Sequence, residues 1–381
     1  MSPLPNTGPG AEFVVPDYQG RSLGDLLPAV AAALGVDVGL PATSLRLPSS
    51  QRYVVFLVDG LGLELLREHP TYAPYLHSLV AGSQPGTAGV PSTTATSLTS
   101  FGTALPPGAH GLVGYTSRIP GTDRLLNALQ WDERVDAREW QPHPTAFSRL
   151  AAAGVQVTVV NKRSFADSGL TVAGHRGAEY VPADKPGEQL AAVLEVSRTA
   201  PSVTYMYDGD LDWMGHRYGV ASPQWEQQLS VIDAFAERLR ETLPEDTRVV
   251  VVADHGMVDC PLGGRLDVDE HPELMAGVAL LGGEARFRHV YCHSGAVGDV
   301  AAAWNETVGD RAEVLLREEA LARGWFGATT PLVLPRLGDV MVACRDRFAV
   351  VSSTTFPHEA KLLGLHGSLT PAEMMIPVLV A

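Results

Sequence analysis

The chain has 381 residues and a formal net charge of −15, with 45% hydrophobic and only 19% charged residues. The length allows roughly two to three domains of about 150 residues, or one large α/β domain with insertions, and the composition excludes a coiled coil and a charge-rich disordered chain. Because no cluster of Lys and Arg stands out against the acidic background, a protein that coats a nucleic-acid polymer is excluded as well.

The expected compartment is the cytoplasm. Residues 1–10 carry neither a basic region nor an apolar region of a signal peptide. No apolar stretch approaches the ~18 residues that cross a bilayer, so no membrane association is expected. The three cysteines, Cys260, Cys292 and Cys344, have neither a disulfide framework nor a zinc-knuckle spacing and are expected to be free thiols.

Strand-like and helix-like segments alternate along most of the chain. Residues 1–20 are rich in Pro and Gly and are expected to be irregular, and a helix with Ser22 as its N-cap is expected over 23–34. Short apolar runs typical of buried strands occur at residues 53–58, 155–160, 203–207, 249–253 and 376–380. Helical stretches occur at residues 63–68, 146–153, 188–199 and 223–243. This alternation predicts an α/β fold with a doubly wound, mostly parallel sheet between helices.

One long segment interrupts the alternation. Residues 261–359 are expected to form a small inserted α+β subdomain, and residues 1–260 and 360–381 to form the catalytic core. Within the insertion, residues 286–292, 339–343 and 348–351 are strand-like, and residues 300–308 and 314–322 are helix-like. Residues 115–145 are expected to form a shorter excursion from the main sheet.

Acidic residues and histidines follow the predicted strands. Ligands of open α/β sheets bind beyond the carboxyl ends of the strands, so the residues at these positions are candidates for a site. Each of these loops also holds a Gly, which lets the backbone bend closely around an ion. The candidates at four strand ends are Asp59, Asp212, His216, Asp254, His255 and His366.

Asp and His together are ligands of divalent metals of the zinc or manganese kind. Six such ligands are too many for one tetrahedral ion and suit two ions with three ligands each. Two ions ~3.5–4 Å apart serve in-line displacement at phosphorus. A single Asp after a strand is usually a cap or turn residue. The recurrence of Asp and His at four strand ends is what favours metal binding.

A hydroxyl-rich stretch supplies a candidate nucleophile. Pro91 is followed by Ser92, Thr93 and Thr94, and a helix is expected from about Ala95 to Phe101. Thr94 would then lie at a helix N-terminus, where backbone N–H groups favour an alkoxide or a phosphate oxygen. This segment alone favours the simpler interpretation that Ser92, Thr93 and Thr94 are N-cap candidates.

The combination of motifs resembles the alkaline phosphatase superfamily and, within it, the type I phosphodiesterase/nucleotide pyrophosphatase family. The resemblance covers residues from about 50 to 260 and from 360 to 381. The motifs occur in the family's order: Asp59-Gly60, Pro91-Ser92-Thr93-Thr94, Gly102-Thr103 through His110-Gly111, Asp212-x-x-Gly215-His216-x-x-Gly219, Asp254-His255-Gly256-Met257 and Gly364-x-His366-Gly367.

The resemblance implies a role for each of these residues. Thr94 would be the nucleophile, with Thr93 as the candidate one position away. One ion would be held by Asp59, Asp254, His255 and the Thr94 hydroxyl, and the other by Asp212, His216 and His366. Both ions are zinc in typical members, with manganese as the alternative. The implied substrate is a small phosphate ester, cleaved through a covalent phospho-threonine.

Two features depart from the family pattern. Ala95-Thr96-Ser97-Leu98 replaces the usual Phe/Tyr-Pro-Asn-His after the nucleophile, and Tyr115 stands where the family has a phosphate-contacting Asn. Tyr115 and Trp213 are the candidate substrate contacts, although aromatic residues more often pack in a core or loop. His358 rivals His366 as a ligand; the flanking Gly364 and Gly367 favour His366.

Several functions share this kind of site. A phosphodiesterase or nucleotide pyrophosphatase is the first interpretation, and the alternatives are a phosphonate (C–P) hydrolase, a phosphomonoesterase and a metal-stabilised binding protein without activity. A monoester dianion needs an additional cation. The arginines near Thr94 in sequence, Arg67 and Arg118, are expected to face solvent or lie in a loop, which favours a diester unless Arg265 or Arg286 of the insertion reaches the site.

Overall fold

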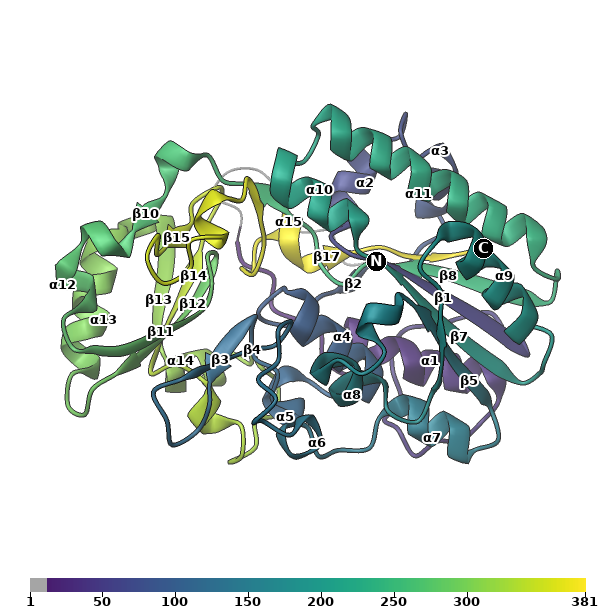
Figure 1. Cartoon of the computed structure of the whole chain (residues 1–381), viewed down its shortest axis with the longest axis horizontal. Helices are drawn as coiled ribbons and strands as arrows, with labels where there is room; N and C mark the ends of the chain where they lie inside the picture. The colour runs from purple at the N-terminus through teal and green to yellow at the C-terminus, as the bar shows by residue number, and fades with distance from the viewer. Residues whose placement is uncertain (1–11) are drawn as a thin grey trace.

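The computed structural model describes residues 12–381, so part of the expected irregular segment at 1–20 lies outside the described residues. At its centre is a six-stranded sheet with the order β18-β8-β1-β7-β5-β6 (Figure 1). The strands are β1 (Arg52–Val58), β5 (Gln156–Asn161), β6 (Glu179–Pro182), β7 (Ser202–Asp208), β8 (Thr247–Val252) and β18 (Val378–Val380). All pairs are parallel except β18 with β8. The fold is therefore the predicted doubly wound α/β fold.

Helices cover both faces of this sheet (Figure 1). One layer consists of α1 (Leu26–Leu34), α4 (Thr94–Thr103), α7 (Ala146–Ala152) and α8 (Gly169–His175). The other consists of α2 (Leu63–Glu68), α3 (Pro74–Val80), α9 (Pro186–Val196), α10 (Asp210–Tyr218) and α11 (Pro223–Thr242). Because both faces are covered, the central strands carry continuous apolar runs; residues 53–58 of β1 are all buried.

A second unit lies beside this sheet and corresponds to the predicted insertion (Figure 1). Its antiparallel sheet has the order β11-β12-β14-β13, formed by β11 (Val278–Glu284), β12 (Phe287–Cys292), β14 (Val340–Cys344) and β13 (Ala312–Leu316). The helices of this unit are α12 (Pro272–Met275), α13 (Val297–Val308) and α14 (Arg317–Ala322). The exact limits, 261 and 359, stay a prediction.

Short elements complete the chain. The expected excursion at 115–145 contains the hairpin of β3 (Thr116–Arg118) and β4 (Leu125–Asn127) and the helix α6 (Ala137–Trp140), preceded by α5 (Pro107–His110). Three further strand pairs are β2 (Gly86–Thr87) with β17 (Met375–Ile376), β9 (Val258–Asp259) with β16 (Gly364–Leu365), and β10 (Leu266–Asp267) with β15 (Val350–Val351). Helix α15 (Pro371–Met374) precedes β17. Among residues 12–381, none of the helices combines the length and apolar composition that crossing a bilayer requires.

Two predicted elements differ from the structure. The helix expected at 314–322 begins only at Arg317, because residues 312–316 form a strand that pairs with β14. The Glu319 carboxylate accepts the N–H of Leu316 at 2.8 Å and caps the helix at this point. The strand expected at 376–380 is split at Pro377, and its second half runs antiparallel to β8.

Candidate metal centre and nucleophile

Three aspartates converge at the carboxyl ends of the central strands. Asp59 directly follows β1, Asp254 follows β8 after one residue, and Asp212 lies in the first turn of α10, which begins just after β7. Since β8, β1 and β7 are neighbours in the sheet, their ends bring these carboxylates together. The side chains of Asp59 and Asp254 are almost completely buried, and that of Asp212 is 14% exposed.

Three histidines complete the cluster. His255 follows Asp254, His216 lies one helical turn after Asp212 in α10, and His366 follows β16. The rings of His255 and His366 are stacked, with their centroids 3.8 Å apart. The structure thus brings together all six of the residues that the sequence predicts as metal ligands.

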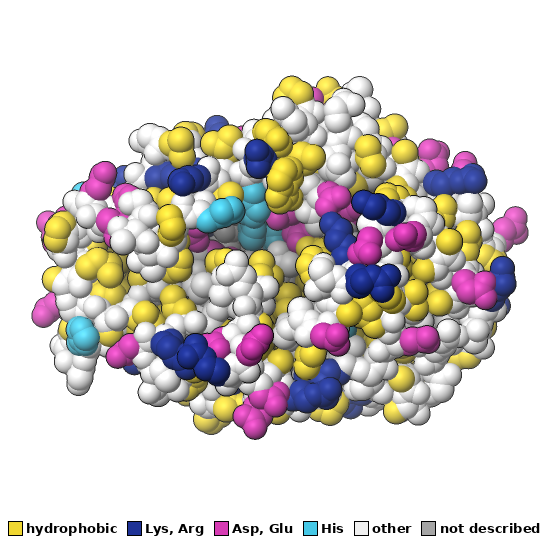
Figure 2. Space-filling model, viewed as in Figure 1, with side chains coloured by type: hydrophobic (Ala, Val, Ile, Leu, Met, Phe, Trp, Pro, Cys, Tyr) yellow, Lys and Arg dark blue, Asp and Glu magenta, His cyan; other side chains and the backbone are white. Residues whose placement is uncertain are grey.

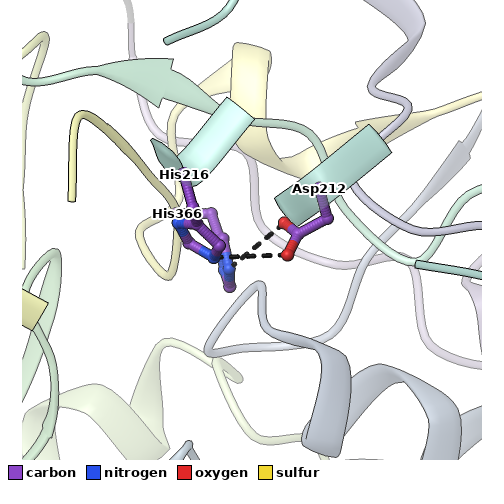
Figure 3. A group of neighbouring side chains, drawn as sticks. All are labelled: Asp212, His216 and His366. Carbon is purple, nitrogen blue, oxygen red and sulfur yellow. Dashed lines mark ion pairs between the residues drawn. The ribbon is translucent and has the colours of Figure 1, made fainter. Parts of the chain in front are cut away.

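The ligand atoms form two adjoining groups. In the first, Nε2 of His216 lies 3.3 Å from Oδ2 of Asp212, and Nε2 of His366 lies 3.8 Å from Oδ1 of the same carboxylate (Figure 3). In the second, Asp59, Asp212 and His255 each offer a ligand atom within 4.8 Å of the others. Asp254 adjoins this second group, with its Oδ2 3.5 Å from Nε2 of His255. Asp212 belongs to both groups, so two ions held here would be close neighbours.

Among the described residues, too few positive charges and hydrogen-bond donors surround the carboxylates of the cluster. Oδ1 of Asp212 and Oδ2 of Asp254 are buried without a hydrogen-bond partner. Burial, together with the neighbouring Asp254, raises the pKa of Asp59 well above its usual value, and burial raises the pKa values of Asp212 and Asp254 to about 7. Divalent cations would satisfy both the free oxygens and the mutual repulsion, so the residues fit the metals that the sequence predicts.

Each of the three histidine rings is held by a backbone carbonyl group. Nδ1 of His216 lies 2.7 Å from the carbonyl oxygen of Gly364, Nδ1 of His366 lies 2.9 Å from that of Ser92, and Nδ1 of His255 lies 3.0 Å from that of Gly256. A carbonyl oxygen only accepts, so each Nδ1 carries the proton and each Nε2 presents a lone pair. Metal-bound histidines are typically fixed in this way.

Thr94 is the first residue of α4, and Thr93 is its N-cap. The Thr94 hydroxyl lies 3.2 Å from Oδ2 of Asp59 and 3.3 Å from Nε2 of His255. The structure therefore places the Thr94 hydroxyl, predicted as the nucleophile, against the second ligand group and at a helix N-terminus.

Two polar residues of the site were not predicted from the sequence. The Tyr207 hydroxyl donates to Oδ2 of Asp59 at 2.5 Å, and its place at the end of β7 was the available signal. Glu284, at the end of β11, is buried; the Thr93 hydroxyl and the N–H of Tyr115 donate to it. Burial raises the pKa of Glu284 to about 8. Nothing in the spacing of Glu284 indicated that the second unit reaches the nucleophile turn.

The remaining predicted residues lie around this cluster. The Tyr115 hydroxyl accepts a hydrogen bond from Nδ2 of Asn127 at 2.7 Å, which leaves its own O–H free to donate. Trp213, next to Asp212, is 51% exposed and lies under the guanidinium of Arg217. His358 is exposed and belongs to neither ligand group, so the cluster contains His366 and not its rival.

The arginines of the second unit are engaged elsewhere. Arg286 is completely buried in a two-point ion pair with Glu373. Arg265 donates to backbone carbonyl groups, among them that of Cys260 at 2.6 Å. Arg118 pairs with Asp123 at 2.9 Å. Among the described residues, none of these three guanidinium groups is paired with the clustered carboxylates.

The cluster lies in a surface hollow between the main sheet and the second unit. Figure 2 shows histidine side chains gathered in this hollow, with acidic side chains beside them and hydrophobic side chains along its upper edge. The cluster is only partly accessible to solvent, since His366 is 9% exposed and the Asp212 side chain is 14% exposed.

Comparison with known proteins agrees with this geometry. The sequence profile described as "Type I phosphodiesterase / nucleotide pyrophosphatase" matches residues 53–369, which include all six clustered Asp and His residues and Thr94.

Solved structures of two kinds of hydrolase share the fold. Murine ectonucleotide pyrophosphatase/phosphodiesterase 5 is similar with a TM-score of 0.68 at 17% identity, over 87% of this chain and 88% of that chain. An inactive variant of that murine protein in complex with AMP has a TM-score of 0.67 at 17% identity, with 87% of each chain covered. Phosphonoacetate hydrolase from Sinorhizobium meliloti, in complex with phosphonoformate, has a TM-score of 0.65 at 18% identity, over 88% and 91% of the two chains.

Proposed function

Since the chain belongs to the type I phosphodiesterase/nucleotide pyrophosphatase family, we propose that it is a two-metal hydrolase of phosphodiester or pyrophosphate bonds in small, nucleotide-like substrates. The observation that carries this proposal is the position of the Thr94 hydroxyl, 3.2 Å from Asp59 and 3.3 Å from His255, beside a cluster of six Asp and His side chains.

Thr94 is the nucleophile of the proposed reaction. Its oxygen attacks phosphorus, the bond from phosphorus to the leaving oxygen breaks, and a phospho-threonine forms. Water then cleaves the bond between phosphorus and the Thr94 oxygen and restores the hydroxyl. Thr94 is the first residue of α4, so its oxygen lies at a helix N-terminus, where the free backbone N–H groups and the helix dipole favour negative charge at both stages.

The proposed ligands divide between two ions. Asp59, Asp254, His255 and the Thr94 hydroxyl would hold one, and Asp212, His216 and His366 the other, with zinc as the first choice and manganese as the alternative. When bound, the two ions lower the pKa of the Thr94 hydroxyl and neutralise charge on the leaving oxygen. Tyr207 orients Asp59 through its 2.5 Å hydrogen bond.

The substrate contacts proposed for this site are Tyr115 and Trp213. Tyr115 donates its free O–H to a phosphoryl oxygen, and Trp213 stacks on the aromatic group of the second ester. A diester monoanion suits the site better than a monoester dianion, because Arg118, Arg265 and Arg286 are all engaged with other partners.

The test compares p-nitrophenyl phosphate with bis-p-nitrophenyl phosphate on one zinc-loaded preparation at mildly alkaline pH. We expect a higher kcat/KM for the diester, and a clear monoester preference would move the protein to the phosphatases. Phosphonate hydrolysis is the second candidate, favoured by the similarity to phosphonoacetate hydrolase. Release of inorganic phosphate from phosphonoacetate on the same preparation would favour that alternative. Absence of turnover of any of these compounds would favour a metal-stabilised binding protein.

A further inference from the structure

The second unit reaches the metal cluster through the tip of one hairpin. Strands β11 and β12 are joined by Ala285 and Arg286, and the Arg286 side chain is fully buried against the loop that follows His366. Its Nε donates to Oε1 of Glu373 at 2.8 Å and its Nη2 to Oε2 at 2.7 Å. Such a two-point pair fixes direction as well as distance.

Glu373 also forms hydrogen bonds with the loop after His366, which comprises residues 367–370. Its Oε1 also accepts the backbone N–H of Ser368 at 3.0 Å, and its Oε2 accepts the Thr370 hydroxyl at 2.5 Å. The Ser368 hydroxyl in turn donates to the carbonyl oxygen of Cys344 in β14, at 2.5 Å. The loop after His366 is therefore bonded to the second unit at two separate points.

The same loop is bonded to the nucleophile turn. The Ser92 hydroxyl donates to the carbonyl oxygen of Ser368 at 2.6 Å and accepts the N–H of Gly367 at 3.2 Å. The Ser92 N–H donates to the carbonyl oxygen of Gly367 at 3.1 Å. A Cβ at Gly367 would lie 2.6 Å from Cγ of Glu284, so the hairpin also packs directly against this loop.

We infer that Arg286 and Glu373 are positioning residues for His366, and that the second unit thereby holds one metal ligand in its place. Neither side chain joins the ligand groups, and both are completely buried, so they act through the bonded loop. Loss of the partners that orient metal ligands typically costs 10–100-fold in metal affinity or activity. This inference rests on the proposed metal-dependent function.

The experiment uses Arg286→Lys, which keeps the positive charge and removes the two-point geometry. Arg288→Lys is the matched control: Arg288 is an equally buried arginine of the same hairpin, and it pairs with Glu359 instead of the loop. The zinc-loaded full-length proteins are mixed with an excess of a chelating colour indicator for zinc, and zinc release is followed by the absorbance of the zinc–indicator complex. kcat and KM for bis-p-nitrophenyl phosphate and the thermal midpoint are measured on the same samples.

We expect Arg286→Lys to release zinc about tenfold faster than the wild type and to lower kcat more than it raises KM. Arg288→Lys should lower the thermal midpoint to a similar degree and release zinc at the wild-type rate. Equal zinc release by both variants, or unchanged release by Arg286→Lys, would overturn the inference. Thr370→Val removes one donor to Glu373 without touching the ion pair, and it should show a smaller effect in the same direction even if Arg286→Lys does not fold.

The zinc measurement separates this inference from the proposed function. A wild type that binds zinc but hydrolyses no diester overturns the proposed reaction, and faster zinc release by Arg286→Lys would still support the positioning role. A wild type that hydrolyses the diester and a pair of variants with equal zinc release would overturn the positioning role alone. A wild type that takes up no zinc or manganese would overturn both.

Discussion

Nδ1 of His366 lies 2.9 Å from the carbonyl oxygen of Ser92, two residues before Thr94. One hydrogen bond thus joins a candidate metal ligand to the turn that carries the candidate nucleophile. Because this bond fixes the His366 tautomer and also the path of the backbone into α4, the metal cluster and the nucleophile are built as one assembly.

Replacing the nucleophile should separate chemistry from metal binding. Thr94→Ala is expected to lower kcat by about a thousandfold or more, because the covalent step is lost. The zinc content should stay near two ions per chain, because Asp59, Asp254 and His255 still hold the ion beside residue 94. Thr94→Ser should keep appreciable activity, since it retains a hydroxyl. Thr96→Ala is the control, because Thr96 is buried in the same helix and its hydroxyl has no partner. Loss of activity in Thr93→Ala with an active Thr94→Ala would move the nucleophile by one position.

Metal analysis should find close to two zinc ions per chain after mild dialysis. Asp254→Asn is expected to weaken chiefly the ion beside Thr94, whereas Asp212→Asn should weaken chiefly the ion that Asp212 would share with His216 and His366. Asp233→Asn serves as the control, since Asp233 is a buried acid outside the cluster that accepts two backbone N–H groups. One ion or none in the wild type would contradict the two-metal interpretation.

Acid should destabilise the fold through histidines outside the cluster. Burial lowers the pKa of His175 to about 4, and both of its nitrogens lack hydrogen-bond partners. The unfolded chain binds this proton near pH 6.5 and the folded chain only near pH 4, so stability is complete above about pH 6.5 and falls as the pH drops toward 4. The loss from this one group is on the order of 3 kcal/mol at still lower pH.

His175→Phe is the test of this pH dependence. The ring of His175 packs against Phe147 and Tyr205, so an aromatic replacement keeps the contacts and removes the titration. Urea unfolding from pH 7 to pH 4 should show a shallower loss of stability for His175→Phe than for the wild type. His293→Gln, at an exposed position, is the control substitution. Identical slopes for the wild type and His175→Phe would contradict the assignment.

Removal of the Trp213 ring should act only on substrates with an aromatic second ester. Stacking of a base on an aromatic side chain is worth about 1–3 kcal/mol, so Trp213→Ala should lower kcat/KM for bis-p-nitrophenyl phosphate by about tenfold. For methyl p-nitrophenyl phosphate the change should be much smaller, because the methyl ester offers no ring. An equal loss on both substrates would show that Trp213 acts on the metal ligand beside it.

The parts of the fold that the sequence predicts are those built from apolar runs. Residues 53–58, 203–206 and 249–252 are all buried and form strands where strands are predicted. Strand β6 was not predicted, because it is an edge strand that is half-exposed and ends at Pro182. Strand β11 was not predicted either, since Gly282 and Gly283 interrupt its apolar pattern.

The candidate site likewise contains residues that the sequence predicts and groups that it does not. Its Asp and His residues could be located from the sequence, because they are residue types that bind metals and they follow predicted strands. The groups that orient these side chains could not, since the carbonyl oxygens of Ser92, Gly256 and Gly364 belong to the backbone and carry no signature of residue type. Tyr207 and Glu284 contact the site through tertiary packing, which spacing along the chain does not encode.

The antiparallel pairing of β18 with β8 has a consequence for how the protein is made. Ribosomes deliver the chain from the N-terminus, so β8 emerges with Asp254 and His255 before the whole second unit, while β18 and His366 emerge after it. The edge of β8 stays open during that interval, and an open strand edge invites pairing with other chains. A chain truncated before Val378 keeps this edge open and is therefore expected to aggregate on expression.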